Sequence, residues 1–222
     1  MTEDWKSKEE ARILLIGHDP RLQKSDTEAK YVLFANYFFE EIPKPISEKQ
    51  KYGLAKSTFD YIAYLTLNKF KPENIYITNL CNDALVHAPK GRTVLIPKDK
   101  AEKGLNNINK ILLKNQSIEY IFPMSLQVNY WLQKLDFYNS NDDFLKLSEP
   151  KEKGLKNNPP YFEVQTKRTF QMICGKEFSI NNGKHKVIPI LHVKNYPLKG
   201  RFLDAYGDKY KETINIFKNK NK

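Results

Sequence analysis

The stretch Arg12-Ile-Leu-Leu-Ile-Gly-His-Asp-Pro-Arg-Leu22 decides the fold. Its first half is an unbroken apolar run that ends at Gly17. A strand without polar alternation is typical of a parallel sheet that is covered on both faces. Pro20 has a fixed φ and no backbone N–H, so the strand cannot continue through it. We therefore expect a buried central strand that opens into a polar loop at His18.

Further short apolar runs predict more strands of the same kind. Three of them lie at Ile75–Thr78, Ser117–Phe122 and Val187–Leu191. The last of these and the apolar run Phe170–Cys174 flank a turn at Asn181-Asn-Gly183, which is a typical turn sequence.

Segments with helical spacing of apolar residues separate these runs. Helices are predicted from about Ser47 to Lys69, Lys100 to Leu113, Leu126 to Leu135 and Lys199 to Phe217, after a first helix that carries Tyr31, Phe34, Phe38 and Phe39. Alternating strands and helices imply parallel βαβ units. The prediction is an α/β fold, a three-layer α/β/α sandwich with a central four-stranded, mostly parallel sheet. It forms one domain over residues 1–222, with an insertion at about 139–185.

Polar residues follow the predicted strands at their carboxyl ends, where ligands bind in such sheets. They are His18 and Asp19 after the first strand, Asn79 after the second, Ser125 near the third and His192 after the fourth. An Asn side chain can read an amide-like edge with one donor and one acceptor. A carboxylate can orient water or stabilise positive charge, and an imidazole can support an anionic leaving group. These residues suit hydrolysis of a substrate with a planar, hydrogen-bonding group.

The charge of the chain indicates which partners it could bind. The formal net charge is +11, and most of the excess lies in residues 90–114 and 194–222. Such basic segments suit a phosphate backbone, although a lysine-rich solvated surface explains them equally well.

There is no Gly-x-Gly-x-x-Gly or phosphate-binding Walker loop, and no Gly-x-Ser-x-Gly elbow. No run of about 18 apolar residues is present, and the N-terminus is polar and partly acidic, so the expectation is a cytoplasmic protein. The two cysteines, Cys81 and Cys174, are expected to be buried thiols rather than metal ligands.

Four motifs resemble the uracil-DNA glycosylase superfamily, in the same order and spacing. Gly17-His-Asp-Pro-Arg-Leu22 is similar to the family's first motif, Gly-Gln-Asp-Pro-Tyr-His, and Ile75-Tyr-Ile-Thr-Asn-Leu80 to its second strand. The segment from Asn79 through Ala88-Pro-Lys-Gly-Arg92 to Asp99 resembles the Asn…Pro-x-Gly-Asn-Arg…Pro segment of the bacterial branches. Ile190-Leu-His192 resembles the start of the closing His-Pro-Ser-Pro motif. The resemblance covers most of the chain outside about residues 139–185.

The resemblance implies a monofunctional DNA base glycosylase, a hydrolase of base-excision repair that acts on uracil or a related damaged base flipped from DNA. It implies Asp19 and His192 as catalytic residues, with Asp19 positioning water and His192 binding the base oxygen. His18, Pro20, Phe34 and Asn79 would bind the base. Basic residues and a wedge would hold the DNA, namely Arg21, Lys194, Leu198, Lys199 and Arg201. The resemblance implies a monomer with no cofactor or metal and with DNA as its partner.

The chain departs from the family at the closing loop, which reads His192-Val-Lys-Asn-Tyr-Pro197, and at Arg21, where the uracil-specific branch has tyrosine. Base preference therefore stays open. A structural interpretation also stands for each site residue: Asp19 can cap its own turn, Asn79 can satisfy loop amides, and His192 can be a core histidine. A catalytically inactive relative that binds DNA or a base is the alternative function, and a scaffold that uses only the basic surface is a third.

Overall fold

The computed structural model describes residues 3–18, 32, 35–39, 49–83, 96–139 and 167–219, with the backbone alone at 36, 37, 49–52, 167–169, 194, 201 and 202. Its centre is a sheet of five strands in the order β2-β1-β3-β5-β4. The strands are β1 (Ile13–Gly17), β2 (Ile75–Asn79), β3 (Tyr120–Pro123), β4 (Phe178–Ile180) and β5 (His185–Val187). The neighbouring strands β2, β1, β3 and β5 run parallel to one another, and β4 is antiparallel to β5.

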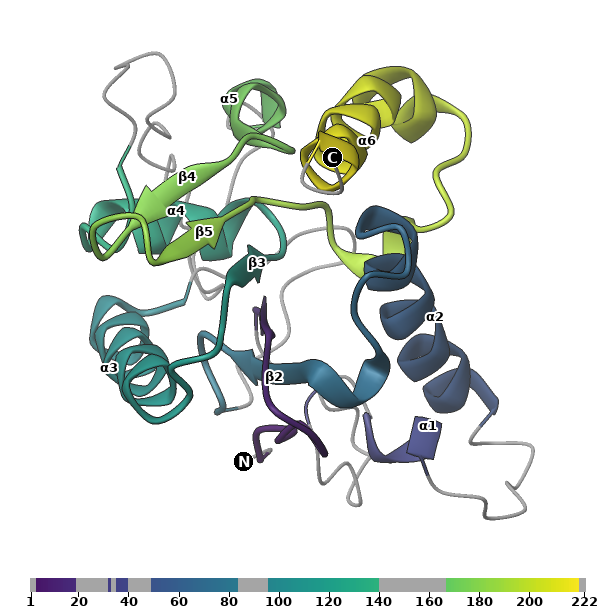
Figure 1. Ribbon diagram of the computed structural model, residues 1–222. Coiled ribbons are helices and arrows are strands. Elements are labelled where there is room, and N and C mark those ends of the chain that lie inside the picture. The colour runs from purple at the N-terminus through teal and green to yellow at the C-terminus, as the bar shows by residue number, and fades with distance from the viewer. Residues whose placement is uncertain are drawn as a thin grey trace, which may run out of the picture.

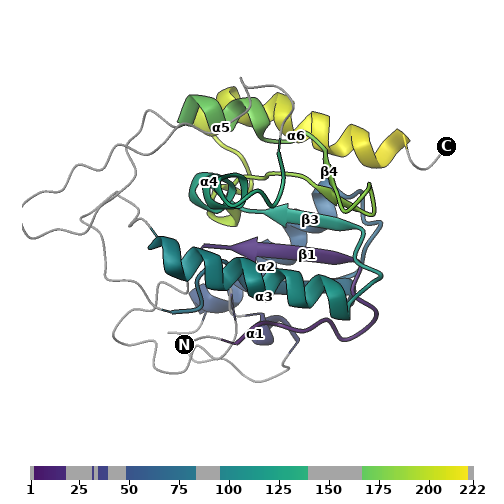
Figure 2. The same cartoon turned by 90° about the vertical axis from the view of Figure 1, so that its left-hand side faces the viewer.

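The β1 strand lies between β2 and β3, as its sequence predicts. Its residues Ile13 to Ile16 are fully buried, because helices cover both faces of the sheet. The helices are α1 (Asn36–Phe39), α2 (Lys49–Leu65), α3 (Lys98–Lys114), α4 (Leu126–Lys134), α5 (Lys167–Ile173) and α6 (Arg201–Asn219). In Figures 1 and 2, α3 and α4 lie on one face of the sheet and α2 and α6 on the other. The mixed α/β architecture and the mostly parallel sheet are thus confirmed.

The prediction of four strands was wrong, because the sheet has a fifth strand, β4, at its edge. It forms a hairpin with β5 through the predicted turn at Asn181-Asn-Gly183, in which all three residues have positive φ. Both β4 and α5 come from the range 139–185 that was predicted as an insertion. Residues 140–166 of that range lie outside the described part of the chain.

The last core strand also lies earlier than predicted, at His185–Val187 instead of Val187–Leu191. The chain still runs beside β3 beyond Val187: Ile188 N–H donates to Ile121 and Ile190 N–H donates to Pro123. Pro189 between them has no N–H to donate, which interrupts regular pairing. The apolar run Phe170–Cys174 is mostly helical: Phe170 and Ile173 are buried on one face of α5, and Cys174 is buried directly after it.

Short 3₁₀ turns complete the described elements. They are η3 (Pro72–Asn74), which leads into β2, and η6 (Val193–Asn195), which follows His192. Over the described ranges, no helix combines the length and the apolar character needed to cross a membrane.

Candidate functional site

The carboxyl ends of β1 and β2 meet at one edge of the sheet. This edge is the row of strand ends from which the loops leave, and not one of the outer strands β2 and β4. Gly17 and Asn79, the last residues of the two strands, are paired in register. The pairing continues into the loops, since Leu80 N–H donates to Gly17 at 2.9 Å and Cys81 N–H donates to His18 at 3.0 Å. The loop that begins at His18 therefore starts alongside the loop that follows Asn79.

Gly17 makes room for the side chain of Asn79. A Cβ at position 17 would lie 2.3 Å from Asn79 Oδ1, much closer than two such atoms can approach. Asn79 itself is 3% exposed. The glycine thus allows the carboxamide to lie against the backbone of β1, so the end of the first strand defines the position of the second strand's polar side chain.

His18 is also buried, with 7% of its surface exposed. It stands between the strand and the predicted catalytic loop, so the structure brings His18 and Asn79 to the same edge as the sequence predicts. The other residues predicted for the base pocket, namely Asp19, Pro20 and Phe34, lie outside the described residues, as does Arg21.

The third and fourth strand ends also reach this edge. Met124 forms a parallel bridge with Ile190, and Ser125 N–H donates to the Ile190 carbonyl at 3.0 Å. Ser125 has a φ of 79°, a left-handed conformation that is uncommon outside glycine. His192 follows two residues after Ile190 and is half-buried, and its carbonyl accepts the Asn195 N–H that closes η6.

The residues predicted to bind DNA follow His192. Leu198 is half-buried against the core, Lys199 is exposed, and Arg201 opens α6. Lys194 lies in η6. The side chains of Lys194 and Arg201 are outside the described part of the structure, so their contacts with DNA remain predictions, as does the role of Leu198 as a wedge.

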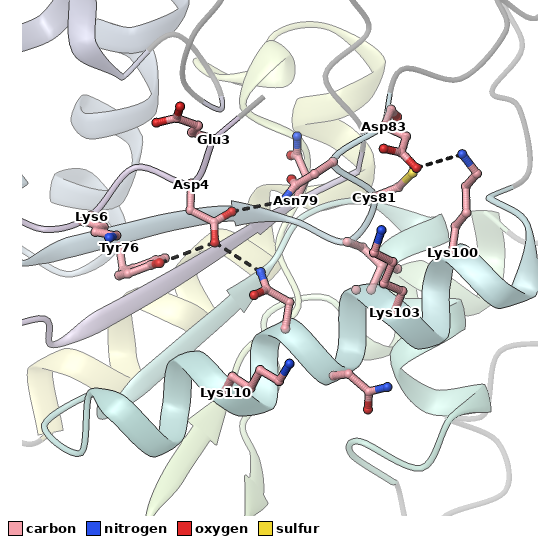
Figure 3. Close-up of a pocket in the computed structure, with 15 residues that line it drawn as sticks. Glu3, Asp4, Lys6, Tyr76, Asn79, Cys81, Asp83, Lys100, Lys103 and Lys110 are labelled. Carbon is pink, nitrogen blue, oxygen red and sulfur yellow. Dashed lines mark hydrogen bonds and ion pairs between the residues drawn. The ribbon is translucent and has the colours of Figure 1, made fainter. Parts of the chain in front are cut away.

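Sequence reasoning missed a cluster around Asp4. Its Oδ1 accepts hydrogen bonds from Thr78 Oγ1 (2.6 Å) and Asn82 Nδ2 (3.2 Å), and its Oδ2 accepts from Asn107 Nδ2 (3.1 Å) and Tyr76 Oη (3.4 Å). These donors come from β2, from the loop after β2 and from α3, and Figure 3 shows Asp4 with its hydrogen bond from Tyr76. Burial and the negative charge of Asp4 raise the pKa of Tyr76, which keeps the phenol a donor. Asp4 thus ties the N-terminal segment to the strand that carries Asn79.

A cavity of about 590 Å³ opens beside this cluster, between the N-terminal segment and α3. Asn79 is part of its wall. Its charged lining residues are Glu3, Asp4, Lys6, Asp83, Lys100, Lys103 and Lys110. No sequence signal pointed to this cavity, because its walls come from residues about a hundred positions apart.

Within the cavity, Lys100 Nζ donates to Asp83 Oδ2 at 2.9 Å. This hydrogen bond lowers the pKa of the Asp83 carboxyl and raises the pKa of Lys100. Both side chains are about one-third exposed, so the pair contributes little to the stability of the fold. The pair does hold the Lys100 ammonium group in the cavity wall, beside the loop that follows Asn79.

The cysteines are buried free thiols, as expected from the sequence. Burial raises the pKa of the Cys174 thiol to about 12, so it is protonated at neutral pH. Among the described residues, no group of three or more His, Cys, Asp and Glu side chains could hold a metal ion. The described polar side chains at the sheet edge are the Asn79 amide, the imidazoles of His18 and His192 and the hydroxyl of Ser125.

A scan against protein-family models found no match to this chain, and a search of curated proteins found none either.

Proposed function

We propose that the protein is a DNA base glycosylase of the uracil-DNA glycosylase type. The observation that carries the proposal is the close packing of the Asn79 carboxamide against Gly17, directly beside His18, at the shared end of two parallel strands. An amide in this position can read the edge of a flipped base, and the next residue along the chain after His18 is the carboxylate Asp19.

The order of the strands supports the same function. The ends of β2, β1, β3 and β5 lie next to one another in the sheet, so the segments that carry Asn79, His18, Ser125 and His192 reach one edge. The helices on both faces of the sheet are consistent with the α/β/α sandwich of that superfamily. Fold alone is shared by many functions, so the proposal depends on the residues at this edge.

In the proposed mechanism, the target nucleotide leaves the base stack and enters the pocket at this edge. Asn79 binds the edge of the base, with His18 beside it. Asp19 orients a water molecule and stabilises the sugar cation as the N-glycosidic bond breaks. His192 donates a hydrogen bond to the base oxygen, where the electrons of the broken bond collect. The water then adds to the sugar cation and gives up a proton to Asp19, and a proton is returned to the base anion, which leaves an abasic site and the free base.

The closing loop favours a second candidate, a relative that binds DNA or a base without excising it. The sequence His192-Val-Lys-Asn-Tyr-Pro197 lacks the family's Pro-Ser-Pro. The half-buried ring of Tyr196 stacks on Tyr61 of α2, with centroids 5.0 Å apart, so this part of the loop packs against the protein.

The test is incubation of the protein, without added metal, with oligonucleotides that each carry one uracil, hypoxanthine, xanthine or mismatched thymine. Alkaline strand scission reports abasic sites. For a glycosylase, Asp19→Asn and His192→Ala should abolish most turnover while DNA affinity remains. Asp208→Asn is the matched control, because this exposed carboxylate pairs only with Lys211 among the described residues. Tight binding of DNA without scission on any substrate would overturn the proposal in favour of the binding protein.

A further inference from the structure

The cavity beside Asn79 holds lysines that form no ion pair with its carboxylates, although the charge of Lys103 helps to lower the pKa of Asp83. Asp83 pairs with Lys100, and Asp4 is occupied by four neutral hydrogen-bond donors. Glu3 points away from α3 in Figure 3. Lys6, Lys103 and Lys110 form no ion pair with any described residue. From this arrangement we infer that the cavity binds the phosphates of a nucleic-acid strand.

The spacing of the lysines on α3 fits several phosphates in a row. Lys103 and Lys110 are two helical turns apart, which places them on the same side of α3 with their Cα atoms separated by about 10 Å along the axis. Phosphates of one strand follow one another at about 3.4 Å along the axis of a duplex, so lysines about 10 Å apart can contact different phosphates of the same strand. Lys6 lies across the cavity, on the N-terminal segment.

The residues that line the cavity suit the phosphate backbone of a nucleic-acid strand better than its bases. Tyr76 is the only aromatic residue that lines the described cavity, and it is 7% exposed with its hydroxyl bonded to Asp4. It therefore offers no open face on which a base could stack, whereas base-binding grooves depend on such faces. Lysine ammonium groups, by contrast, are point charges suited to phosphate.

The choice of a nucleic-acid strand as the ligand rests on the proposed function, because the cavity shares Asn79 with the edge of the sheet. A nucleic-acid strand whose flipped nucleotide reaches Asn79 would continue into the cavity beside Asn79. The volume of about 590 Å³ is within the range of ligand-binding pockets, roughly 300–1,000 Å³. Such contacts would position the strand without reading its sequence.

The test compares two triple variants of the full chain. In the cavity variant, Lys6, Lys103 and Lys110 are changed to Gln. In the control variant, the same charge is removed at Lys69, Lys71 and Lys176, which lie after α2, before η3 and after α5. Thermal melting first establishes that both variants fold. The dissociation constant of a labelled single-stranded oligothymidylate is then measured over a range of salt concentrations.

Each phosphate contact to a single strand contributes about 0.7 to the slope of log affinity against log salt. This slope is negative, so loss of three contacts should make it shallower by about 2 in the cavity variant, and the control variant should leave it close to that of the unchanged protein. Equal slopes in the two variants would overturn the inference. It would also be overturned if the cavity variant lost binding of inorganic phosphate but kept its oligonucleotide affinity and slope.

The two proposals can fail separately. A shallower salt dependence of oligonucleotide affinity in the cavity variant, with no base excised by the unchanged protein, would support the phosphate-binding cavity and contradict the glycosylase. Excision by the unchanged protein, with equal slopes in the two variants, would support the glycosylase and contradict the phosphate-binding cavity.

Discussion

Asn79 Oδ1 lies where the side chain of any residue larger than glycine at position 17 would begin, since a Cβ there would be 2.3 Å from it. Gly17 and Asn79 belong to different strands, and 61 residues separate them in the chain. The pair nevertheless acts as one unit: the first strand ends in glycine so that the second can end in a buried amide. This dependence makes position 17 a test of the role of Asn79 that leaves Asn79 in place.

Gly17→Ala is expected to displace the Asn79 carboxamide. The methyl group meets the end of a side chain and not a backbone atom, so unfolding free energy should fall by only about 1–2 kcal/mol. Base excision should fall as far as it does in Asn79→Ala. Denaturant titration and the alkaline-scission assay measure the two effects. Gly53→Ala in α2 is the control, since no atom lies within 4 Å of its Cβ, and it should gain about 0.5–1 kcal/mol. Excision at the normal rate by Gly17→Ala would argue against Asn79 as the base reader.

Gly104→Ala should destabilise the protein more than Gly17→Ala does. A Cβ at Gly104 would lie 1.8 Å from the backbone oxygen of Leu80, so α3 would have to move away from the loop after β2. Overpacking of this kind costs about 1–3 kcal/mol, and a fixed backbone atom places the change at the upper end. Urea titration measures the loss. Gly207→Ala in α6, whose Cβ would meet only the end of the Leu203 side chain at 3.4 Å, should cause none.

Asp4→Ala should destabilise the contact between the N-terminal segment and β2. The Thr78 hydroxyl is fully buried, and its other acceptor, the Asn79 carbonyl, is 3.4 Å away. Loss of the acceptor leaves a buried donor poorly satisfied, which costs about 1–3 kcal/mol. The free energy of unfolding in urea reports the change. Glu3→Ala, at an exposed neighbouring position, should stay within about 0.5 kcal/mol of the unchanged protein. Equal stability of the two variants would show that the Asp4 cluster contributes nothing to the fold.

Stability is expected to fall at alkaline pH because of buried acids. Burial raises the pKa of Cys174 from 9.0 to about 12 and that of Tyr206 from 10.0 to about 12. Above about pH 9 the unfolded chain releases the Cys174 proton and the folded chain keeps it, so the unfolded state is increasingly favoured as pH rises. Urea titrations between about pH 8 and 11 should show this decline, and Cys174→Ala should make it shallower. A decline of the same steepness in Cys174→Ala would exclude a contribution from the thiol.

Apolar runs were sufficient to predict the centre of the fold. The unbroken runs at Ile13–Ile16 and Ile75–Thr78 are buried on both faces, so their sequences directly reflect the parallel sheet that surrounds them. The edge strand β4 has an exposed Ser179 between two buried residues and is only three residues long. Such a short alternation also occurs in loops, which is why the fifth strand was missed.

The candidate site was predictable only where it follows directly from a strand end. His18 and Asn79 could be placed together because parallel strands end at one edge. The Asp4 cluster joins residue 4 to residues 76, 78, 82 and 107, and hydrogen bonds over such separations leave no periodic pattern in the sequence. The cavity that this cluster borders could therefore be recognised only from the structure.

The two histidines near β5 should respond to substitution in opposite ways. His185 is 2% exposed, and its Nδ1 lies 2.7 Å from the Ile118 carbonyl, so it links β5 to the residues before β3. His185→Ala leaves that carbonyl without its partner and should cost about 1–3 kcal/mol of unfolding free energy, while folded protein keeps its rate of base excision. His192 is half-buried at the edge of the sheet, so His192→Ala should cost less stability and most of the excision. Urea titration and single-turnover excision on both variants separate the two effects. If His185→Ala also lost excision while still folded, the loss in His192→Ala would no longer distinguish a catalytic histidine from one that supports the strand.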